Sequence, residues 1–418
     1  MLIEFRVRNF RSLRDEQVLS LVAAKDKTLE DTNTIETGLK AAPRLVRSAV
    51  VYGPNAGGKS NLLKALQWMQ WFVLGSAQLQ PEQPLEVSPF RMDAASGQQP
   101  TCFEVTFVRS GIRYQYGFEV TNLRVLREYL LVYKTAKPQK WYERNFDSTT
   151  GQESYDFGSA LTGQKTVWRE ATRPNSLFLS IAVMLNGVEL KPVYEWFSSC
   201  LRVINDNSPL GLDYTLSALS IDNNCKLICH FLSTADTSIS DINVVTEKVA
   251  GVPFVGVDPK TGQVVFRNDE REVKQLRLVH RTDSSQAEFA LGDESTGTQR
   301  MLCIAGPILS VLKEGMTFFV DELDTSLHPL LVRRLVTMFH STSLNQKGAQ
   351  LVFCTHDSSL LDGDLFRRDQ IWFVEKDREQ ASKLYPLTDF SPRKNEALER
   401  GYLMGRYGAL PFFRDWSL

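Results

Sequence analysis

Residues 53–60 of the chain read Gly53-Pro54-Asn55-Ala56-Gly57-Gly58-Lys59-Ser60 and fit the pattern G-x-x-x-x-G-K-S/T throughout. In this pattern glycines let successive backbone N–H groups point at an anion, and we expect positive φ angles at Gly53 and Gly58. The lysine reaches the β- and γ-phosphates of a nucleotide, and the serine hydroxyl binds Mg²⁺. The stretch therefore predicts a phosphate-binding loop.

The residues on either side of the loop agree with this prediction. A short β-prone run, Ser48 to Tyr52, precedes the loop, and a helical pattern continues from Asn61. Strand, loop and helix N-terminus in this order are the context that the motif requires. A glycine-rich turn with an incidental lysine is the alternative. The predicted nucleotide-binding residues are Gly53, Asn55, Gly57, Gly58, Lys59, Ser60 and Asn61.

Length and composition are those of an ordinary globular protein. The chain has 418 residues, enough for two or three domains or for one large domain with an insertion. Its net charge of −1 gives no global attraction to nucleic acid, so such binding would need a local patch. The first residues do not resemble a signal peptide, and the longest near-apolar stretch, Met301 to Leu312, is too short to span a bilayer. We therefore expect a soluble cytoplasmic protein without membrane contact.

A second part of a nucleotide site is predicted near residue 320. The apolar run Thr317 to Val320 ends in Asp321 and Glu322, so both carboxylates would emerge at the carboxyl edge of a sheet, where ligands bind in α/β folds. Asp321 can hold Mg²⁺ and Glu322 can polarise an attacking water. A strand followed by an ordinary acidic turn is the alternative, and the phosphate loop upstream favours the functional interpretation.

Two further segments have spacings that suit the same site. His356 follows the apolar run Leu351 to Cys354 and can hydrogen-bond a γ-phosphate or the attacking water; an ordinary loop histidine is the alternative. Residues Ser295 to Gln299 precede a long apolar helix, where small hydroxyl residues and glycine form either an anion site or a simple N-cap.

The pattern of apolar residues divides the chain into three parts. Residues 1–160 hold the phosphate loop and several β-prone runs that suggest antiparallel hairpins; 161–280 read as mostly helical; and 281–418 form a second α/β segment. The insertion at 161–280 is too short, and its heptads too few, for a long coiled coil. Within it Cys225, Cys229 and His230 could form a metal site, but the pattern favours the buried face of a helix.

The order of these motifs resembles that of the ABC-type ATPases of the SMC, RecF and OLD group. The resemblance implies an α/β head with a mixed sheet, an antiparallel β-subdomain and a helical insertion. It also implies ATP and Mg²⁺ as ligands, a signature segment at Ser295 to Gln299, and a histidine switch at His356. Asp324 would belong to the loop that follows the acidic strand. In that group two heads enclose ATP, so Ser295 and Gly297 of one chain would face the phosphate loop of another, in a homodimer or higher homo-oligomer. The usual Leu-Ser-Gly-Gly-Gln signature is Glu294 to Gln299 here, and Ser295, Gly297 and Gln299 match it.

A narrower resemblance covers nearly the whole chain. The segments Asn9 to Ser12, Glu294 to Arg300, Asp321 to Pro329 and Gly401 to Ala409 look like those of RloA/AbiLi-type ATPases. These resemble the ATPase subunits of bacterial abortive-infection systems, including PARIS. The resemblance implies a separate nuclease or toxin-like effector, often of TOPRIM type, and allows a phage-encoded trigger. About 60 residues follow His356 and show no TOPRIM segment, so we expect the nuclease to be a second polypeptide.

Three assignments stay open at this point. The group needs a polar residue that senses Mg²⁺, for which Glu128 is the first candidate and Gln83 the second. Arg11 either approaches the phosphates or is an exposed turn arginine. The aromatic tail, Tyr402 to Trp416, is either a docking surface or packs on the sheet. Two other functions compete with effector control: a RecF-type protein that binds DNA, and a nucleotide-gated scaffold with slow turnover.

Overall fold

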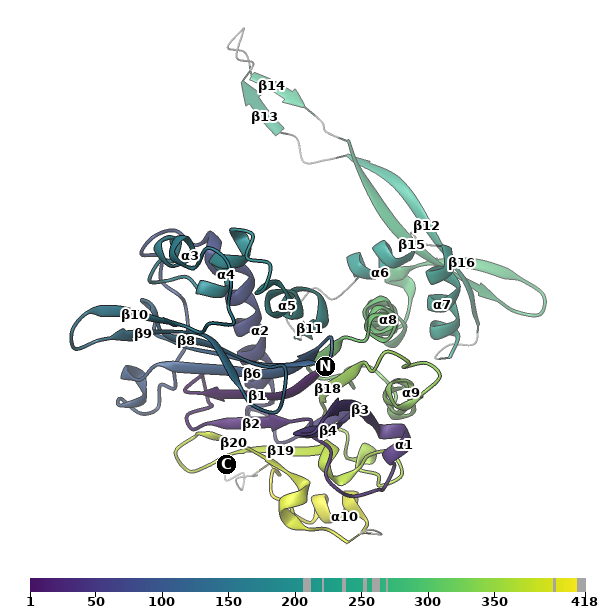
Figure 1. Ribbon diagram of the computed structural model, residues 1–418. Coiled ribbons are helices and arrows are strands. Elements are labelled where there is room, and N and C mark those ends of the chain that lie inside the picture. The colour runs from purple at the N-terminus through teal and green to yellow at the C-terminus, as the bar shows by residue number, and fades with distance from the viewer. Residues whose placement is uncertain are drawn as a thin grey trace, which may run out of the picture. The chain divides into compact units, whose positions relative to one another are not determined.

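The computed structural model describes residues 1–205, 212–219, 222–234, 238–250, 254–257, 264–267, 270–393 and 396–411. Arg414 and Trp416 of the aromatic tail lie outside these residues. The chain forms two compact units, which we describe separately (Figure 1). Unit 1 comprises Met1–Ser208, Val311–Thr325 and Pro329–Leu418, and unit 2 comprises Pro209–Ser310 and Ser326–His328.

A mixed sheet of six strands lies in unit 1. Its strand order is β11 (Leu201–Ile204), β17 (Thr317–Val320), β18 (Gln350–Cys354), β5 (Ser48–Tyr52), β19 (Ile371–Lys376) and β20 (Ser382–Pro386). All neighbours pair in parallel except β19 and β20. Every residue of β5, β17 and β18 is buried, which is typical of central strands in a parallel sheet. The carboxyl ends of β11, β17, β18, β5 and β19 therefore meet at one edge.

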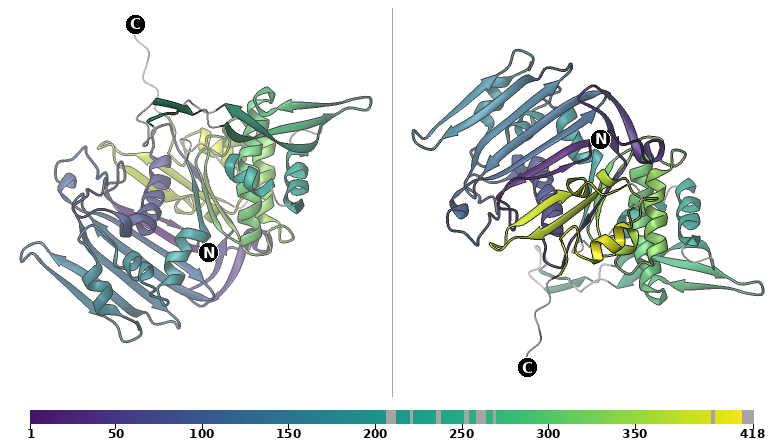
Figure 2. Two further views of the ribbon diagram at one scale, coloured as in Figure 1. Left: turned by 90° about the horizontal axis from the view of Figure 1, so that it is seen from above. Right: turned by 90° about the horizontal axis from the view of Figure 1, so that it is seen from below.

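A seven-stranded antiparallel sheet forms the other layer of unit 1. Its order is β10 (Gln152–Phe157), β9 (Gln139–Asp147), β8 (Val125–Tyr133), β7 (Ile112–Val120), β6 (Thr101–Arg109), β1 (Leu2–Arg8) and β2 (Gln17–Ser20). Both views of Figure 2 show its blue strands side by side. The predicted α/β fold with a mixed sheet and an antiparallel β-region is thus confirmed.

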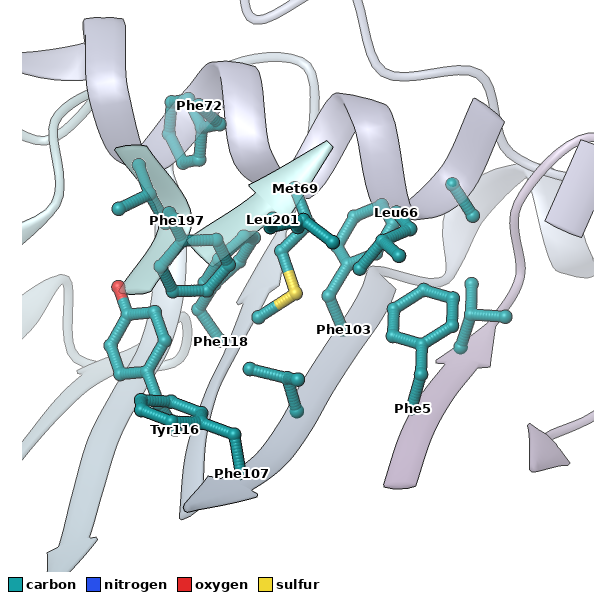
Figure 3. Packing of buried hydrophobic residues seen from close by; sticks show 14 of the residues in the cluster. Phe5, Leu66, Met69, Phe72, Phe103, Phe107, Tyr116, Phe118, Phe197 and Leu201 are labelled. Carbon is teal, nitrogen blue, oxygen red and sulfur yellow. The ribbon is translucent and has the colours of Figure 1, made fainter. Parts of the chain in front are cut away.

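The core of unit 1 forms around helix α2 (Lys59–Gly75), which follows the phosphate loop. Its residues Leu66, Met69 and Phe72 point towards Phe103 and Phe118 on the antiparallel strands (Figure 3). The same cluster includes residues of β5, β17, β18 and β19. Each such side chain contributes on the order of 1.5–3 kcal/mol by leaving water, so α2 is fixed against both sheets.

Smaller elements complete unit 1. A hairpin of β3 (Thr34–Leu39) and β4 (Ala42–Val46) follows the single-turn helix α1 (Glu30–Asn33). The remaining helices are α3 (Lys165–Ala171), α4 (Phe178–Met184), α5 (Lys191–Glu195), α9 (Pro329–His340) and α10 (Leu398–Leu403). None of the helices in the described part of the chain is long and apolar enough to cross a membrane.

Unit 2 contains helices and a long β-ribbon. Its helices are α6 (Leu212–Leu219), α7 (Asp222–Ser233) and the part of α8 (Thr296–Glu314) that ends at Ser310. Strands β12 (Ile239–Ala250), β15 (Glu270–Arg281) and β16 (Gln286–Ala290) form one antiparallel sheet, and β13 (Phe254–Val257) pairs with β14 (Val264–Arg267).

This division differs from the predicted boundaries at 160 and 280. Residues 161–205 pack as part of unit 1, and the second unit continues to Ser310. The insertion is also less helical than expected, since β12 and β15 pair along almost their whole length. The physical reason is local, because Val244, Val245 and Val249 on β12 are β-branched residues, which favour strands.

Candidate nucleotide-binding site

The phosphate loop joins the end of β5 to the start of α2. Gly58 has φ 116°, as expected, and a Cβ there would overlap the side chain of Ser382. The expectation for Gly53 is corrected, because its φ is not positive. A glycine is required there because a Cβ would overlap the backbone carbonyl of Val374 on β19. Ala56 has the positive φ instead, at 61°.

Lys59 is the first residue of α2 and is 5% exposed. Its Nζ donates to the carbonyl oxygens of Gly53 at 2.7 Å and Pro54 at 3.2 Å, and it lies 3.4 Å from Nδ1 of His356. Burial lowers the pKa of Lys59, while Asp321 and Glu322 are among the groups that oppose this shift. The ammonium group therefore stands among oxygen acceptors that a phosphate could replace.

The acidic pair emerges from β17 at the same edge. Asp321 is 2% exposed, and its backbone N–H donates to the carbonyl of Ile204 on β11 at 2.9 Å. Its Oδ1 is buried and has no hydrogen-bond partner in the described ranges. Glu322 has φ 49°, a left-handed conformation that is uncommon outside glycine. Such an outlier is often found at functional sites, where surrounding structure holds it.

His356 connects the acidic strand to the loop lysine. Its Nε2 lies 4.0 Å from Oε1 of Glu322, and its backbone N–H donates to Oδ2 of Asp324 at 3.2 Å. Burial is the largest cause that lowers the pKa of His356; Lys59 also lowers it, and the three nearby carboxylates act in the opposite sense. The ring is therefore held neutral at neutral pH and can both donate and accept a hydrogen bond.

These groups share one cavity of about 370 Å³. It is lined by the whole loop from Pro54 to Lys59 and by Ser60, Asn61, Glu322, His356 and Lys376. Residues that are about 260 to 300 positions apart in sequence thus meet at one place. The arrangement could hold a triphosphate on the loop and present a carboxylate and an imidazole to its terminal phosphate.

The turn at residues 9–12 supports the loop from one side. Nδ2 of Asn61 donates to Oγ of Ser12 at 2.7 Å, and Oγ of Ser382 lies 2.8 Å from the same atom and 2.7 Å from the carbonyl of Gly57. Arg11 lines two neighbouring hollows rather than the loop cavity itself. The structure therefore places Arg11 beside the cavity, and its backbone N–H donates to the carbonyl of Ser88 rather than to the loop.

The residues present fit a divalent cation. Mg²⁺ binds through one or two carboxylates together with substrate phosphates and waters. Two buried carboxylate oxygens at this edge, Oδ1 of Asp321 and Oδ1 of Asp324, have no hydrogen-bond partner in the part of the chain that the structure describes. Ser60 adds a hydroxyl at the cavity wall. These groups could hold Mg²⁺ beside the phosphates.

Glu128 does not fit the predicted role of a magnesium sensor. It is completely buried within β8. Its Oε1 accepts from the hydroxyls of Tyr116 and Tyr142 and the N–H of Leu179, and its Oε2 accepts from the N–H of Phe178. Nη1 of Arg144 lies 3.9 Å away. With both oxygens engaged, Glu128 holds the first turn of α4 to the sheet. Gln83, the second candidate, lies in the loop after α2, and its side chain accepts from the N–H of Gln80.

Asn205 is the polar residue that sequence reasoning missed. It follows β11 directly, beside Asp321 on the neighbouring strand, and is 6% exposed. Its Nδ2 donates to the side chain of Gln67 on α2, whereas its buried Oδ1 has no partner among the described residues. A short β-branched run ending in Asn-Asp-Asn was the available signal.

The signature segment lies in unit 2. Oγ of Ser295 accepts from the N–H of Thr298 at 3.1 Å, so it caps the start of α8. A Cβ on Gly297 would lie 3.0 Å from the carbonyl of Ser326, which leaves little room for another residue. Oε1 of Glu294 accepts from Nε2 of His280 at 2.8 Å, which ties the segment to β15.

Comparison with protein families shows to which family the chain belongs. The family model described as "AAA domain, putative AbiEii toxin, Type IV TA system" matches residues 48–362, from β5 to beyond His356. The chain belongs to this family and is an ATP-hydrolysing P-loop ATPase. No curated protein matches it.

Solved structures of other ATPase heads show a distant likeness. An SMC head domain from Thermotoga maritima is 11% identical with a TM-score of 0.43, over 92% of this chain and 98% of that one. An Smc head domain with an extended coiled coil, bound to the C-terminal domain of ScpA derived from Pyrococcus furiosus, is 12% identical with a TM-score of 0.39, over 97% of this chain and 98% of that one. Values this low do not indicate a shared function.

Proposed function

We propose that this member of the family is the Mg²⁺-dependent ATPase subunit of a bacterial anti-phage, abortive-infection system. It would sense infection and control a separate nuclease or toxin effector. ATP hydrolysis is supported by one observation: Lys59, Ser60, Glu322 and His356 line the same cavity. The part that concerns defence is supported by the family description and by the resemblance to RloA/AbiLi-type ATPases.

Each residue of the cavity has a distinct role in this proposal. The N–H groups of the loop and Lys59 bind the β- and γ-phosphates of ATP. Ser60, Asp321 and Asp324 hold Mg²⁺, which neutralises charge on the phosphates when bound. Glu322 orients and deprotonates the attacking water, and His356 holds that water or the γ-phosphate by a hydrogen bond. Asn205 takes the place of Glu128 as the polar residue that faces the metal.

The assembly in this proposal is an ATP-bridged dimer. Ser295 and Gly297 of one chain would meet the phosphates bound by another, because a helix N-terminus with exposed N–H groups favours an anion. Glu322→Gln would bind ATP without hydrolysing it and keep the assembly closed. Light scattering of this variant should report a dimer or larger oligomer with ATP and a smaller species with ADP. The same mass with both nucleotides would reject the bridging role of ATP.

Effector control can be tested in cells. If the reading frame next to the gene encodes a nuclease-like or toxin-like protein, the two would be expressed together, and phage plating measured with wild type and with Lys59→Ala. We expect protection only with the wild-type pair, and ATP-dependent co-purification of the two proteins. Equal protection by Lys59→Ala would reject ATP-dependent control, while leaving the ATPase assignment to be judged by turnover alone.

A second candidate function is nucleic-acid binding of RecF or SMC type. One observation favours it: a hollow of about 460 Å³ in unit 1 is lined by Arg11 and Lys64 together with Trp68 and Trp71. Cations interleaved with tryptophans are the chemistry of a strand-binding surface. ATPase rates with and without duplex and single-stranded DNA, and the salt dependence of binding, distinguish the two. Strong stimulation with a steep salt slope, lost in Trp71→Ala, would favour nucleic acid.

A further inference from the structure

Three potential metal ligands lie together in unit 2, and none of them is among the residues assigned to nucleotide binding. Cys225 and Cys229 are four residues apart on α7, and Asp241 lies near the start of β12. One ligand atom from each lies within 4.8 Å of the others. No other group of this kind occurs among the residues that the structure describes.

The cysteines are not part of the hydrophobic face of α7, contrary to the sequence-based interpretation. Ile228, Phe231 and Leu232 form that face, with exposures of 0%, 4% and 0%. Cys225 and Cys229 are only half-buried and occupy the flank that contacts β12, while His230 is exposed. Packing alone therefore does not explain two thiols at this place.

We propose that Cys225, Cys229 and Asp241 bind one Zn²⁺ ion that fastens α7 to β12, with a water as the fourth ligand. Two thiolates and one carboxylate suit zinc better than Mg²⁺ or Ca²⁺, which take oxygen ligands, and better than Cu⁺, which selects sulfur alone. Asp241 is exposed, so solvent can reach the fourth position.

The spacing of the ligand atoms matches a tetrahedral site. With Zn–S near 2.3 Å and Zn–O near 2.0–2.2 Å, tetrahedral angles put a sulfur and an oxygen about 3.6 Å apart. Sγ of Cys229 lies 3.7 Å from Oδ1 of Asp241. A small rotation of Cys225, whose Sγ is now 3.9 Å from the carbonyl of Ile242, would complete the set.

A backbone irregularity aims Asp241 at the helix. The pairing of β12 with β15 shifts register between Ile239 and Asp241, which is the signature of a bulge. Bulges re-aim single side chains and occur next to functional sites. The N–H of Ile242 donates to Oδ1 of Asp241 at 2.9 Å, which steadies the carboxylate.

A disulfide between the cysteines fits less well. Side chains at i and i+4 of a helix have Cβ atoms about 5–6 Å apart, whereas a disulfide needs about 3.5–4.5 Å. A metal ion spans the longer distance without unwinding α7. It would also stabilise a unit whose described core is small, since a structural zinc site contributes directly to folding.

The first experiment measures zinc in the purified full-length chain. Elemental analysis after preparation without chelators should find one zinc per chain in wild type. Cys225→Ser and Cys229→Ser should lose it, and Asp241→Asn should bind it about 10-fold more weakly or worse in competition with a chromophoric chelator. Cys303→Ser, a half-buried cysteine of the same unit, is the matched control and should keep the metal. Equal zinc content in wild type and in the double variant Cys225→Ser/Cys229→Ser would overturn the proposal.

A second measurement, the absorption spectrum of the cobalt-substituted protein, distinguishes loss of a ligand from failure to fold. Wild-type protein reconstituted with Co²⁺ should show thiolate-to-cobalt charge-transfer absorption in the near ultraviolet, which Cys303→Ser retains and Cys225→Ser lacks. Stoichiometric cobalt without this absorption would mean that sulfur is not a ligand and would refute the site. A Cys225–Cys229 disulfide found by mass spectrometry in metal-free protein kept under reducing conditions would refute it too.

Discussion

Carboxylates at two places in unit 1 differ in whether their buried oxygens have hydrogen-bond partners. At the carboxyl edge of the parallel sheet, Asp321 and Asp324 each keep a buried oxygen without a partner in the described residues. In the antiparallel sheet, the whole side chain of Glu128 is buried, and four N–H or O–H groups donate to its oxygens. Burial alone therefore does not identify the functional acid.

The hydrogen bonds of each carboxylate indicate whether it contributes to ligand binding or to the stability of the fold. A buried polar atom without a hydrogen bond costs about 1–3 kcal/mol, and a bound ion or water that becomes its partner removes this cost. A satisfied carboxylate such as Glu128 stabilises the fold instead. The comparison predicts that substitutions at the first group change chemistry and leave stability nearly intact, whereas substitutions at the second do the reverse.

The largest expected effect is at Asp321. Asp321→Asn keeps the shape of the side chain and removes the charge that would face Mg²⁺. A metal ion supplies several kcal/mol of transition-state stabilisation, so ATP turnover at fixed Mg²⁺ should fall on the order of 10³-fold. Urea unfolding should show an unchanged or slightly higher stability. A steady-state phosphate-release assay measures the turnover. A loss of stability without a loss of turnover would contradict the role of Asp321 in metal binding.

Glu128 should behave in the opposite way. Burial raises the pKa of its carboxyl, and Arg144 with the backbone donors of α4 acts in the opposite sense. Glu128→Leu leaves two tyrosine hydroxyls and two N–H groups without an acceptor and weakens the charge balance at Arg144. We expect a loss of about 3–5 kcal/mol in unfolding free energy. Chemical denaturation checks this, and Glu143→Leu, a partly exposed position on the next strand, is the control.

One buried histidine, His340, extends the comparison to pH. His340 is 6% exposed and its Nε2 lies 2.8 Å from Oγ of Ser48. Burial, with a smaller effect of Arg47, lowers its pKa from 6.5 to about 3. Between these values the unfolded chain binds the proton and the folded chain does not, so His340 makes stability fall as pH falls, by up to about 1.4 kcal/mol per pH unit. His340→Gln should remove this part of the slope between pH 6 and 4, as measured by urea unfolding at each pH. An unchanged slope would show that His340 is already charged in the native state.

The smallest of these effects is expected at Asn205. Its unpartnered Oδ1 beside Asp321 would steady a water in the coordination shell of Mg²⁺. Residues that support a metal through such contacts typically change affinity about 10–100-fold. Asn205→Ala should raise the Mg²⁺ concentration for half-maximal turnover about 10-fold, with maximal turnover little changed. A drop in maximal turnover at saturating Mg²⁺ would place Asn205 elsewhere in the reaction.

Local signals in the sequence were enough to predict most of the site. The phosphate loop is a single run from Gly53 to Ser60, and Asp321, Glu322 and His356 each follow an apolar strand. Because parallel strands share a carboxyl edge, these segments had to meet once the strands were recognised. The α/β class and the antiparallel region followed from the same apolar patterns.

Tertiary contacts explain what the sequence did not predict. Glu128 lies in an alternating strand, and only the packing of α4 against that strand shows that both of its oxygens are engaged. Asn205 lies beside Asp321, which is more than 100 residues away in sequence. Gly53 is required because the carbonyl of Val374, also distant in sequence, lies against it. The length of the β-ribbon in unit 2 was not predicted, because its charged residues weaken the alternation that marks a strand.

We propose that Glu322 activates water on a triphosphate held by Lys59 and Ser60. The most direct test of this proposal is single-turnover ATP hydrolysis by Glu322→Gln, with ATP affinity and unfolding free energy measured on the same preparation. General-base catalysis contributes about 10²–10⁴-fold to the rate, so we expect the rate of hydrolysis to fall by that factor while ATP affinity and unfolding free energy stay unchanged. Hydrolysis at the wild-type rate in Glu322→Gln would contradict it.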